Sequence, residues 1–204
     1  MLLVVSGASG TGKTTARFKA APLLGHAVEP VELWHFGPIP AVPTQVWRQQ
    51  TVEKAVQRAI ELDAEGRHLL LAGDPVPAGE ALAAPSADRV DIAVLLLDVD
   101  DATLNARLDA RQDPPEWRHL HLGFADWMRH HAVDPQYVPE ALTGAGWSEM
   151  RWDRWFGGDV ADRWAMTVLD ASALTPDEAG AALATWCRAA VAGEAPVFRA
   201  GWFR

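Results

Sequence analysis

The sequence predicts a three-layer α/β protein in which helices cover both faces of a five-stranded parallel sheet. Five short apolar runs are the candidate strands: Leu2–Ser6, Val31–Phe36, His68–Gly73, Ile92–Asp98 and Ala165–Asp170. The first, third and fourth runs are almost continuously apolar, which is typical of strands buried on both faces of a parallel sheet. Segments with helical periodicity separate the runs, and this alternation indicates βαβ units rather than an all-β fold.

Capping residues and apolar periodicity predict the helices between these strands. The clearest helix is the last, in which Thr175 is the N-cap, Pro176 takes the first helical position and Glu178 completes a capping box. Gly193 ends this helix. Three further helices are expected over Thr14–Ala21, from about Thr44 to Glu65, and from about Ala102 to Arg111, with Gly66 and the pair Pro114-Pro115 ending the last two.

A tryptophan-rich stretch lies between the proline pair and the last predicted strand. It holds six of the ten tryptophans of the chain: Trp117, Trp127, Trp147, Trp152, Trp155 and Trp164. Helical pieces are expected around Phe124–His131, Pro139–Leu142 and Ser148–Phe156. The length fits a single domain over residues 1–204, in which we interpret residues 112–164 as a helical lid or packing insertion.

Composition narrows the possible partners and the compartment. A formal net charge of −9 argues against a nucleic-acid-binding face, and no apolar run approaches the length of a membrane span. Cys187 is the only cysteine, so an internal disulfide is impossible, and Met1 is followed by apolar residues without the basic region of a signal peptide. We therefore expect a soluble, cytoplasmic protein without nucleic-acid or membrane partners. No pattern in the sequence indicates an oligomeric state.

One motif carries the chemistry. The string Gly7-Ala8-Ser9-Gly10-Thr11-Gly12-Lys13-Thr14-Thr15 satisfies G-x-x-x-x-G-K-[ST], the phosphate-binding P-loop, and it lies between a predicted strand and a predicted helix. Glycines let backbone N–H groups converge on phosphate oxygens, and the helix N-terminus adds its dipole. We expect Lys13 to reach the β- and γ-phosphates, Thr14 to ligate Mg²⁺ and Thr15 to donate to the α-phosphate. The sequence thus predicts ATP and Mg²⁺ as cofactors.

Other classes of P-loop protein fit poorly. Guanine-specific GTPases carry an Asn-Lys-x-Asp motif, and the only asparagine here is Asn105, outside such a motif. The Leu-Ser-Gly-Gly-Gln signature of transporter ATPases is absent, and a hexameric motor usually needs a larger module with a second helical domain.

The sequence resembles the nucleotide-kinase-like branch of the P-loop proteins, which includes nucleoside monophosphate, shikimate and gluconate kinases and antibiotic phosphotransferases. Beyond the P-loop, the resemblance rests on Leu96-Leu97-Asp98-Val99-Asp100 followed by Leu104, Arg107, Leu108 and Arg111, and on Val168–Ser172 before the last helix. It implies a fold with strand order 2-3-1-4-5 and a helix that leads into a lid. Monophosphate kinases carry Asp-Gly-Phe-Pro-Arg after the third strand, where this chain has Gly73-Asp74-Pro75-Val76-Pro77 without the arginine that grips an acceptor phosphate.

Three charged residues are candidates for catalysis besides Lys13. Asp74 follows the third apolar run, where a carboxylate can hold Mg²⁺ or accept a proton from the acceptor; an Asp-Pro turn is the alternative. Arg107 and Arg111 lie one helical turn apart and can stack on adenine or stabilise the transferred phosphoryl group. The alternative is a solvated helix face, or ion pairs with Asp109 or Glu116. For Asp98 we expect capping of the next helix, or a role shared with Asp100.

The acceptor is expected over Glu32–Arg48, where Trp34, His35 and Arg48 flank the proline-rich loop Gly37–Pro43. Small-molecule kinases often place an aspartate after the second strand; here the predicted strand ends Leu33-Trp34-His35-Phe36, so that aspartate is missing. Trp34 and Trp47 are also plausible core residues. The histidines His119, His121, His130 and His131 invite a zinc interpretation, but no Cys or Glu completes a ligand spacing.

The sequence therefore predicts a kinase that transfers the γ-phosphoryl group of Mg²⁺–ATP to a small-molecule or nucleotide acceptor. Lys13, Asp74, Arg107 and Arg111 are the predicted catalytic residues, and Thr14 and Asp74 the predicted metal-side residues. The alternative is a nucleotide-gated regulatory protein that hydrolyses ATP slowly, because no familiar set of acceptor-binding residues is present.

Overall fold

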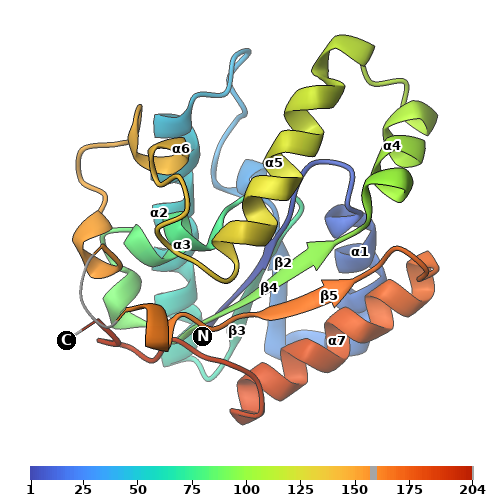
Figure 1. Cartoon of the computed structure of the whole chain (residues 1–204). Helices are drawn as coiled ribbons and strands as arrows, with labels where there is room; N and C mark the ends of the chain where they lie inside the picture. Colours follow the sequence, from blue (N-terminus) through green and yellow to red (C-terminus); the bar gives the residue numbers. More distant parts are fainter. Residues whose placement is uncertain (157–159, 204) are drawn as a thin grey trace.

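A parallel sheet forms the centre of the molecule in a computed structural model, which describes residues 1–156 and 160–203 (Figure 1). Its strands are β1 (Leu2–Ser6), β2 (Val28–Val31), β3 (His68–Ala72), β4 (Ile92–Asp98) and β5 (Thr167–Asp170). All neighbours pair in parallel, in the order β2-β3-β1-β4-β5. The predicted α/β class and strand order are confirmed.

Both faces of the sheet are covered, as the apolar strands require. Leu3 and Val5 of β1 pack towards α1 (Lys13–Leu24) and α7 (Pro176–Ala192), whereas Leu2 and Val4 pack towards α2 (Gln45–Ala64) and α3 (Ala78–Ala83). Successive side chains of a strand point to opposite faces, so an unbroken apolar run supplies both cores. The two outer layers lie on either side of the sheet in Figure 1.

Two helices rise beside the carboxyl end of β4 in Figure 1: α4 (Asp101–Ala110) and α5 (Arg118–His131). The proline pair ends α4, as expected, and a 3₁₀ turn over Pro115–Trp117 leads into α5. A short helix, α6 (Glu140–Thr143), follows. Of the helices in the described part of the chain, none has the length and apolar character that crossing a membrane would take.

The second strand lies earlier than predicted. β2 spans Val28–Val31, and most of the apolar run assigned to it forms a 3₁₀ turn over Leu33–Phe36. Leu33 is apolar because it packs into the core from this turn, while Trp34 is 52% exposed. As an edge strand, β2 needs a less continuous apolar sequence than a central one. The difference matters for the site: the residue directly after the observed strand is Glu32, whereas the predicted strand was followed by Gly37.

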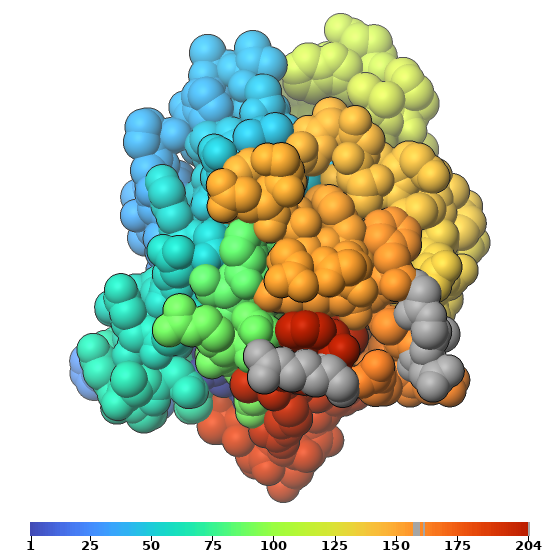
Figure 2. Space-filling view, turned by 90° about the vertical axis from the view of Figure 1, so that its left-hand side faces the viewer, coloured from blue at the N-terminus to red at the C-terminus, as the bar shows by residue number. Residues whose placement is uncertain are grey.

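The tryptophan-rich stretch is mostly part of the core. Trp127, Trp155 and Trp164 are buried, and in Figure 2 the orange end of the stretch lies against the green part of the chain. The helical piece expected around Ser148–Phe156 is a single 3₁₀ turn, Trp152–Arg154. Its polar groups instead satisfy the carbonyl end of α3, where the Arg151 N–H donates to Ala83 O at 2.7 Å. Closure of any part of residues 112–164 as a lid stays a prediction.

The four histidines of the zinc interpretation have separate surroundings. His119 is exposed, His121 lies 3.4 Å from a carboxylate oxygen of Asp113, and His130 stacks on Tyr137. His131 is buried and stacks on Trp127. Within residues 1–156 and 160–203, no three His, Cys, Asp or Glu side chains are grouped as metal ligands would be.

Buried His131 predicts a pH-dependent stability. Its Nε2 accepts a hydrogen bond from Gly79 N–H at 3.1 Å, which requires the neutral ring, and burial lowers its pKa from 6.5 to about 4. Between pH 6.5 and 4, His131 is protonated in the unfolded chain but neutral in the folded protein. The free energy of unfolding therefore falls as the pH drops through this range. At about 1.4 kcal/mol per pKa unit, this residue costs about 3 kcal/mol at the acid end.

We therefore expect His131→Gln to flatten the acid loss of stability, measured by urea unfolding between pH 7 and 4. The amide can still accept from Gly79 but does not titrate. His130→Gln, in the exposed neighbour, is the matched control and should leave the wild-type slope unchanged. Equal slopes for wild type and His131→Gln would contradict the assignment.

Candidate nucleotide-binding site

The P-loop lies between β1 and α1 and opens on a cavity of about 470 Å³. Gly12 is the N-cap of α1 and offers no capping side chain, and no acidic residue lies in the first turn. The N–H groups of that turn therefore remain available to an anion. The cavity is lined by Ser9, Gly10, Thr11, Gly12, Lys13, Thr14, Thr15, Ala16, Gly73, Leu97, Arg107, Arg111, Ala171, Leu174, Thr175, Pro176 and Ala179. Its volume is in the range of small-molecule sites.

Helix α4 packs directly on the P-loop. Gly10 has φ +92°, and a Cβ added there would lie 2.9 Å from Leu104 Cδ1 and 3.3 Å from Leu108 Cδ2. Only glycine allows both this backbone conformation and this approach. The two leucines are buried against the loop, and the same packing brings Arg107 of α4 and Arg111, the residue after α4, to the cavity.

Lys13 is buried, with 3% of its surface exposed, and its Nζ donates to Ala8 O at 2.7 Å. Burial lowers its pKa from 10.5 to about 7, although the nearby carboxylates of Asp74 and Glu32 oppose this shift. A phosphate in the cavity would favour the ammonium form. The loop thus holds a buried amine that is in ion-pair contact with no carboxylate in the part of the chain that the structure describes.

The two arginines of α4 reach the cavity by different routes. Arg107 donates to Thr11 O at 2.6 Å and to Ala171 O at 3.3 Å, so it links the P-loop to the loop after β5. Arg111 donates to Ser9 Oγ at 3.1 Å and forms an ion pair with Asp113, rather than with Asp109 or Glu116. Both guanidinium groups lie where a nucleotide would meet them, and their catalytic roles stay predictions.

The carboxylate next to Thr14 is Glu32. The predicted bounds of the second strand had placed this residue inside the strand rather than after it. Glu32 accepts hydrogen bonds from Trp34 Nε1 at 2.8 Å and from Arg17 at 3.0 Å, and the Thr14 hydroxyl lies close enough to lower its pKa as well. Burial would raise the pKa of Glu32, but these donors outweigh it and hold the pKa below its usual value. A carboxylate following the proline of a short edge strand is the only sequence signal that pointed to this position.

Asp74 is the second carboxylate whose charge acts on the Lys13 ammonium. Its Oδ2 accepts from Leu33 N–H at 2.7 Å, and its charge acts on Lys13. Burial raises the pKa of Asp74, and the negative charge of Glu32 adds to the rise, against the opposing effects of the Leu33 N–H and Lys13. Two adjacent carboxylates therefore have pKa values moved in opposite directions, a pattern that often separates a general base from a permanently charged group.

Gly73 makes room for Glu32. It has φ +144°, and a Cβ there would lie 2.5 Å from Cγ and Cδ of Glu32. We expect Gly73→Ala to cost about 1–3 kcal/mol of stability through backbone strain, and to weaken Mg²⁺–nucleotide binding by displacing the carboxylate. Thermal unfolding and calorimetric titration measure the two effects. Gly66→Ala, at φ +70° in open space, is the control for strain alone; equal nucleotide binding by both variants would contradict the steric role.

The predicted acceptor region is divided between core and surface. Arg48 makes a two-point ion pair with the fully buried Glu80, at 2.7 Å for each contact, and Gln49 also donates to Glu80 at 3.0 Å. Trp47 packs on the core, whereas Trp34 is exposed beside Glu32. Arg48 is thus committed to an internal pair, and the proline-rich loop carries no buried hydrophobic side chain.

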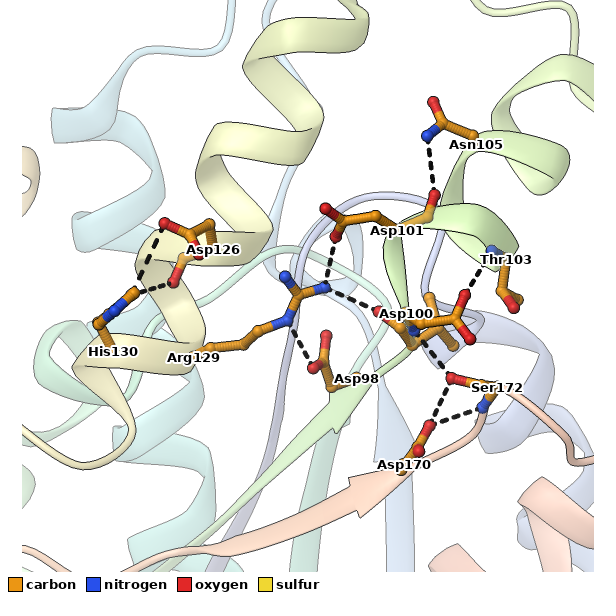
Figure 3. A network of polar contacts seen from close by, with 11 residues as sticks. Asp98, Asp100, Asp101, Thr103, Asn105, Asp126, Arg129, His130, Asp170 and Ser172 are labelled. Carbon is orange, nitrogen blue, oxygen red and sulfur yellow. Dashed lines mark hydrogen bonds and ion pairs between the residues drawn. The ribbon is translucent and has the colours of Figure 1, made fainter.

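Asp98 does not cap α4, as had been expected. The cap is Asp100, which accepts from Thr103 N–H at 2.6 Å. Asp98 instead binds Arg129 of α5 at 2.7 Å, and the same guanidinium donates to Asp101 at 3.0 Å, as Figure 3 shows. Arg129 thereby links the end of β4 and the start of α4 to α5, and the Asp98 carboxylate is paired with this guanidinium instead of capping α4.

The oxygen groups around Thr14 fit a Mg²⁺ ion. Hard cations prefer hydroxyl, carboxylate and phosphate oxygens. The Thr14 hydroxyl lies beside the Glu32 carboxylate and keeps its proton, so its oxygen lone pairs are available to a metal, and the Asp74 carboxylate adds a second nearby charge. Thr14, Glu32 and Asp74 are the residues that would hold the ion, directly or through water.

Comparison with known proteins identifies the fold. No protein-family model and no curated protein matches the chain. The solved structure of an unliganded sugar kinase from Janibacter sp. HTCC2649 is similar at a TM-score of 0.53 and 18% identity, over 94% of this chain and 96% of that one. A chain of the Pnkp1/Rnl/Hen1 RNA repair complex matches 63% of this chain and 45% of its own length at 17% identity, with a TM-score of 0.47 that is too low to carry weight. The chain shares its α/β fold with a sugar kinase.

Proposed function

We propose that this protein is a kinase that transfers the γ-phosphoryl group of Mg²⁺–ATP to a hydroxyl group of a small molecule. The observation that carries the proposal is the pair of carboxylates beside Lys13, one with a raised pKa and one with a lowered pKa, at the edge of a P-loop cavity. A P-loop alone would serve any nucleotide-binding protein. A base candidate next to the phosphate position suits transfer to an acceptor.

Each residue has a distinct proposed role. Bound Mg²⁺–ATP supplies the phosphoryl group and a metal charge that offsets its oxygens. Lys13 and the first turn of α1 bind the phosphates, and Thr14 with Glu32 orients the metal side. Asp74 accepts the proton of the attacking hydroxyl, because its raised pKa makes it the better base of the two carboxylates. Arg107 and Arg111 stabilise negative charge on the side of α4.

The acceptor we favour is a neutral hydroxyl compound, with sugars first. Two arginines on the β2–β3 side are committed to carboxylates, Arg17 to Glu32 and Arg48 to Glu80, and so offer little to an anionic acceptor. The exposed indole of Trp34 beside Glu32 offers an apolar face with a polar rim. The fold shared with a sugar kinase supports the same choice.

Acceptor-dependent ADP release tests the proposal. ATP and Mg²⁺ are incubated with panels of sugars, sugar acids, nucleosides, nucleotides and aminoglycosides, and ADP is measured for each. We expect turnover in the usual kinase range of ~1–100 s⁻¹ with a neutral polyhydroxyl compound, and a phosphorylated product by mass spectrometry. Slow ADP release that no acceptor accelerates would instead favour a nucleotide-gated regulatory protein.

A further inference from the structure

Arg17 is a buried cation in an unusual place. It lies on α1, one turn after Lys13, on the face where the other buried residues are Ala16 and Ala20. Its exposed fraction is 5%, and its Nη2 donates to Glu32 Oε1 at 3.0 Å. Its Nε is buried and has no hydrogen-bond partner within residues 1–156 and 160–203.

Stability alone does not explain this residue. Burying an Arg–Glu pair costs desolvation free energy that the mutual attraction often fails to offset, and well-packed apolar residues are commonly as stable. The unpartnered Nε adds to the cost. Since two alanines serve the packing of the same helix face, a charged residue at this position points to a role in the site.

The geometry identifies that role. Glu32 has donors on both carboxylate oxygens, Arg17 on Oε1 and the Trp34 indole on Oε2, and the Thr14 hydroxyl is near enough to lower its pKa. Gly73 approaches the same side chain so closely that a methyl group would collide with it. The carboxylate is therefore confined, and Arg17 is the cation that neutralises it there. Without Arg17, Glu32 would be free to turn towards solvent or towards the Lys13 ammonium.

We propose that Arg17 is a positioning residue that holds Glu32 against Thr14 and thereby sets the affinity of the P-loop for Mg²⁺ in the presence of nucleotide. The inference rests on the proposed use of Mg²⁺–ATP, and it does not require an acceptor. Removing a partner that orients a metal-binding group typically lowers metal affinity 10–100-fold. An indirect partner such as Arg17 should lie near the lower end of that range.

The test measures, by calorimetry, the binding of a non-hydrolysable ATP analogue at a series of Mg²⁺ concentrations. We expect Arg17→Met to raise the Mg²⁺ concentration at half-maximal binding about tenfold, while binding of the analogue in excess EDTA changes less than twofold. Arg17→Lys, which keeps the charge, should recover part of the shift. If Arg17→Met does not fold, Arg17→Gln takes its place with the same expected direction.

Arg58→Met is the matched control. Arg58 of α2 pairs at 2.8 Å with Glu29 of β2, the strand that leads to Glu32. Neither Arg58 nor Glu29 lines the P-loop cavity. This variant should leave the Mg²⁺ midpoint unchanged. An Arg17→Met midpoint within twofold of wild type overturns the inference, and so does an equal loss of affinity with and without Mg²⁺, which would make Arg17 a direct phosphate ligand. Tight Mg²⁺–nucleotide binding without any phosphorylated acceptor would refute the kinase proposal and leave this inference standing.

Discussion

Replacing Lys13 by Met is expected to abolish useful binding of Mg²⁺–ATP while the protein stays folded. The Nζ of Lys13 is buried on the P-loop carbonyl of Ala8 and is in ion-pair contact with no carboxylate in the part of the chain that the structure describes, so a phosphate would gain an ion pair shielded from water. Removing one partner of such a pair costs about 2–5 kcal/mol. That corresponds to a loss of affinity of roughly 30-fold or more, measurable by calorimetry. Met keeps the aliphatic stem, so no large cavity opens.

Lys19→Met is the control for the lysine substitution. Lys19 lies on the same helix, but half-exposed, and pairs with Asp177 of α7 at 2.7 Å. We expect its replacement to leave nucleotide affinity unchanged, with a small effect on stability at most. Equal affinity of Lys13→Met and wild type, with both folded by circular dichroism, would refute the P-loop assignment.

Asp74→Asn is expected to separate binding from chemistry. Asparagine keeps the shape and can still accept from Leu33 N–H, but it takes no proton and carries no charge. A general base contributes about 10²–10⁴-fold, so turnover with a verified acceptor should fall by that factor. Nucleotide affinity should change little, because Lys13 and the first turn of α1 bind the phosphates. Steady-state turnover and calorimetric affinity, measured on the same preparation, give the two numbers.

Two further variants make the Asp74 result specific. Asp170→Asn neutralises a carboxylate at the end of β5, another parallel strand, and should leave turnover unchanged. Glu32→Gln should raise the demand for Mg²⁺ rather than remove the base, because Glu32 bonds Thr14. A fall under about threefold in Asp74→Asn, with stability unchanged, would reduce Asp74 to a turn residue. A larger fall in Glu32→Gln at saturating Mg²⁺ would move the base to Glu32.

The nucleotide end of the protein was largely determined by the sequence alone. A P-loop needs particular backbone conformations and a helix N-terminus within nine residues, so its motif and its flanking strand and helix carry the information locally. The N-cap Thr175 was predicted for the same reason and is confirmed, since a capping side chain bonds only two or three residues ahead. Strands β1, β3 and β4 were recognisable because central parallel strands are apolar throughout.

Only the tertiary structure decided the acceptor side. Glu32 binds Arg17, 15 residues away, and Asp74 binds the backbone of Leu33, 41 residues away. Parallel strands bring their carboxyl ends to one edge of the sheet, so loops distant in sequence share one site there. The role of a charged residue at that edge depends on which partner reaches it. Arg48 and Asp98 looked available in the sequence, and Glu80 and Arg129 bind them in the fold.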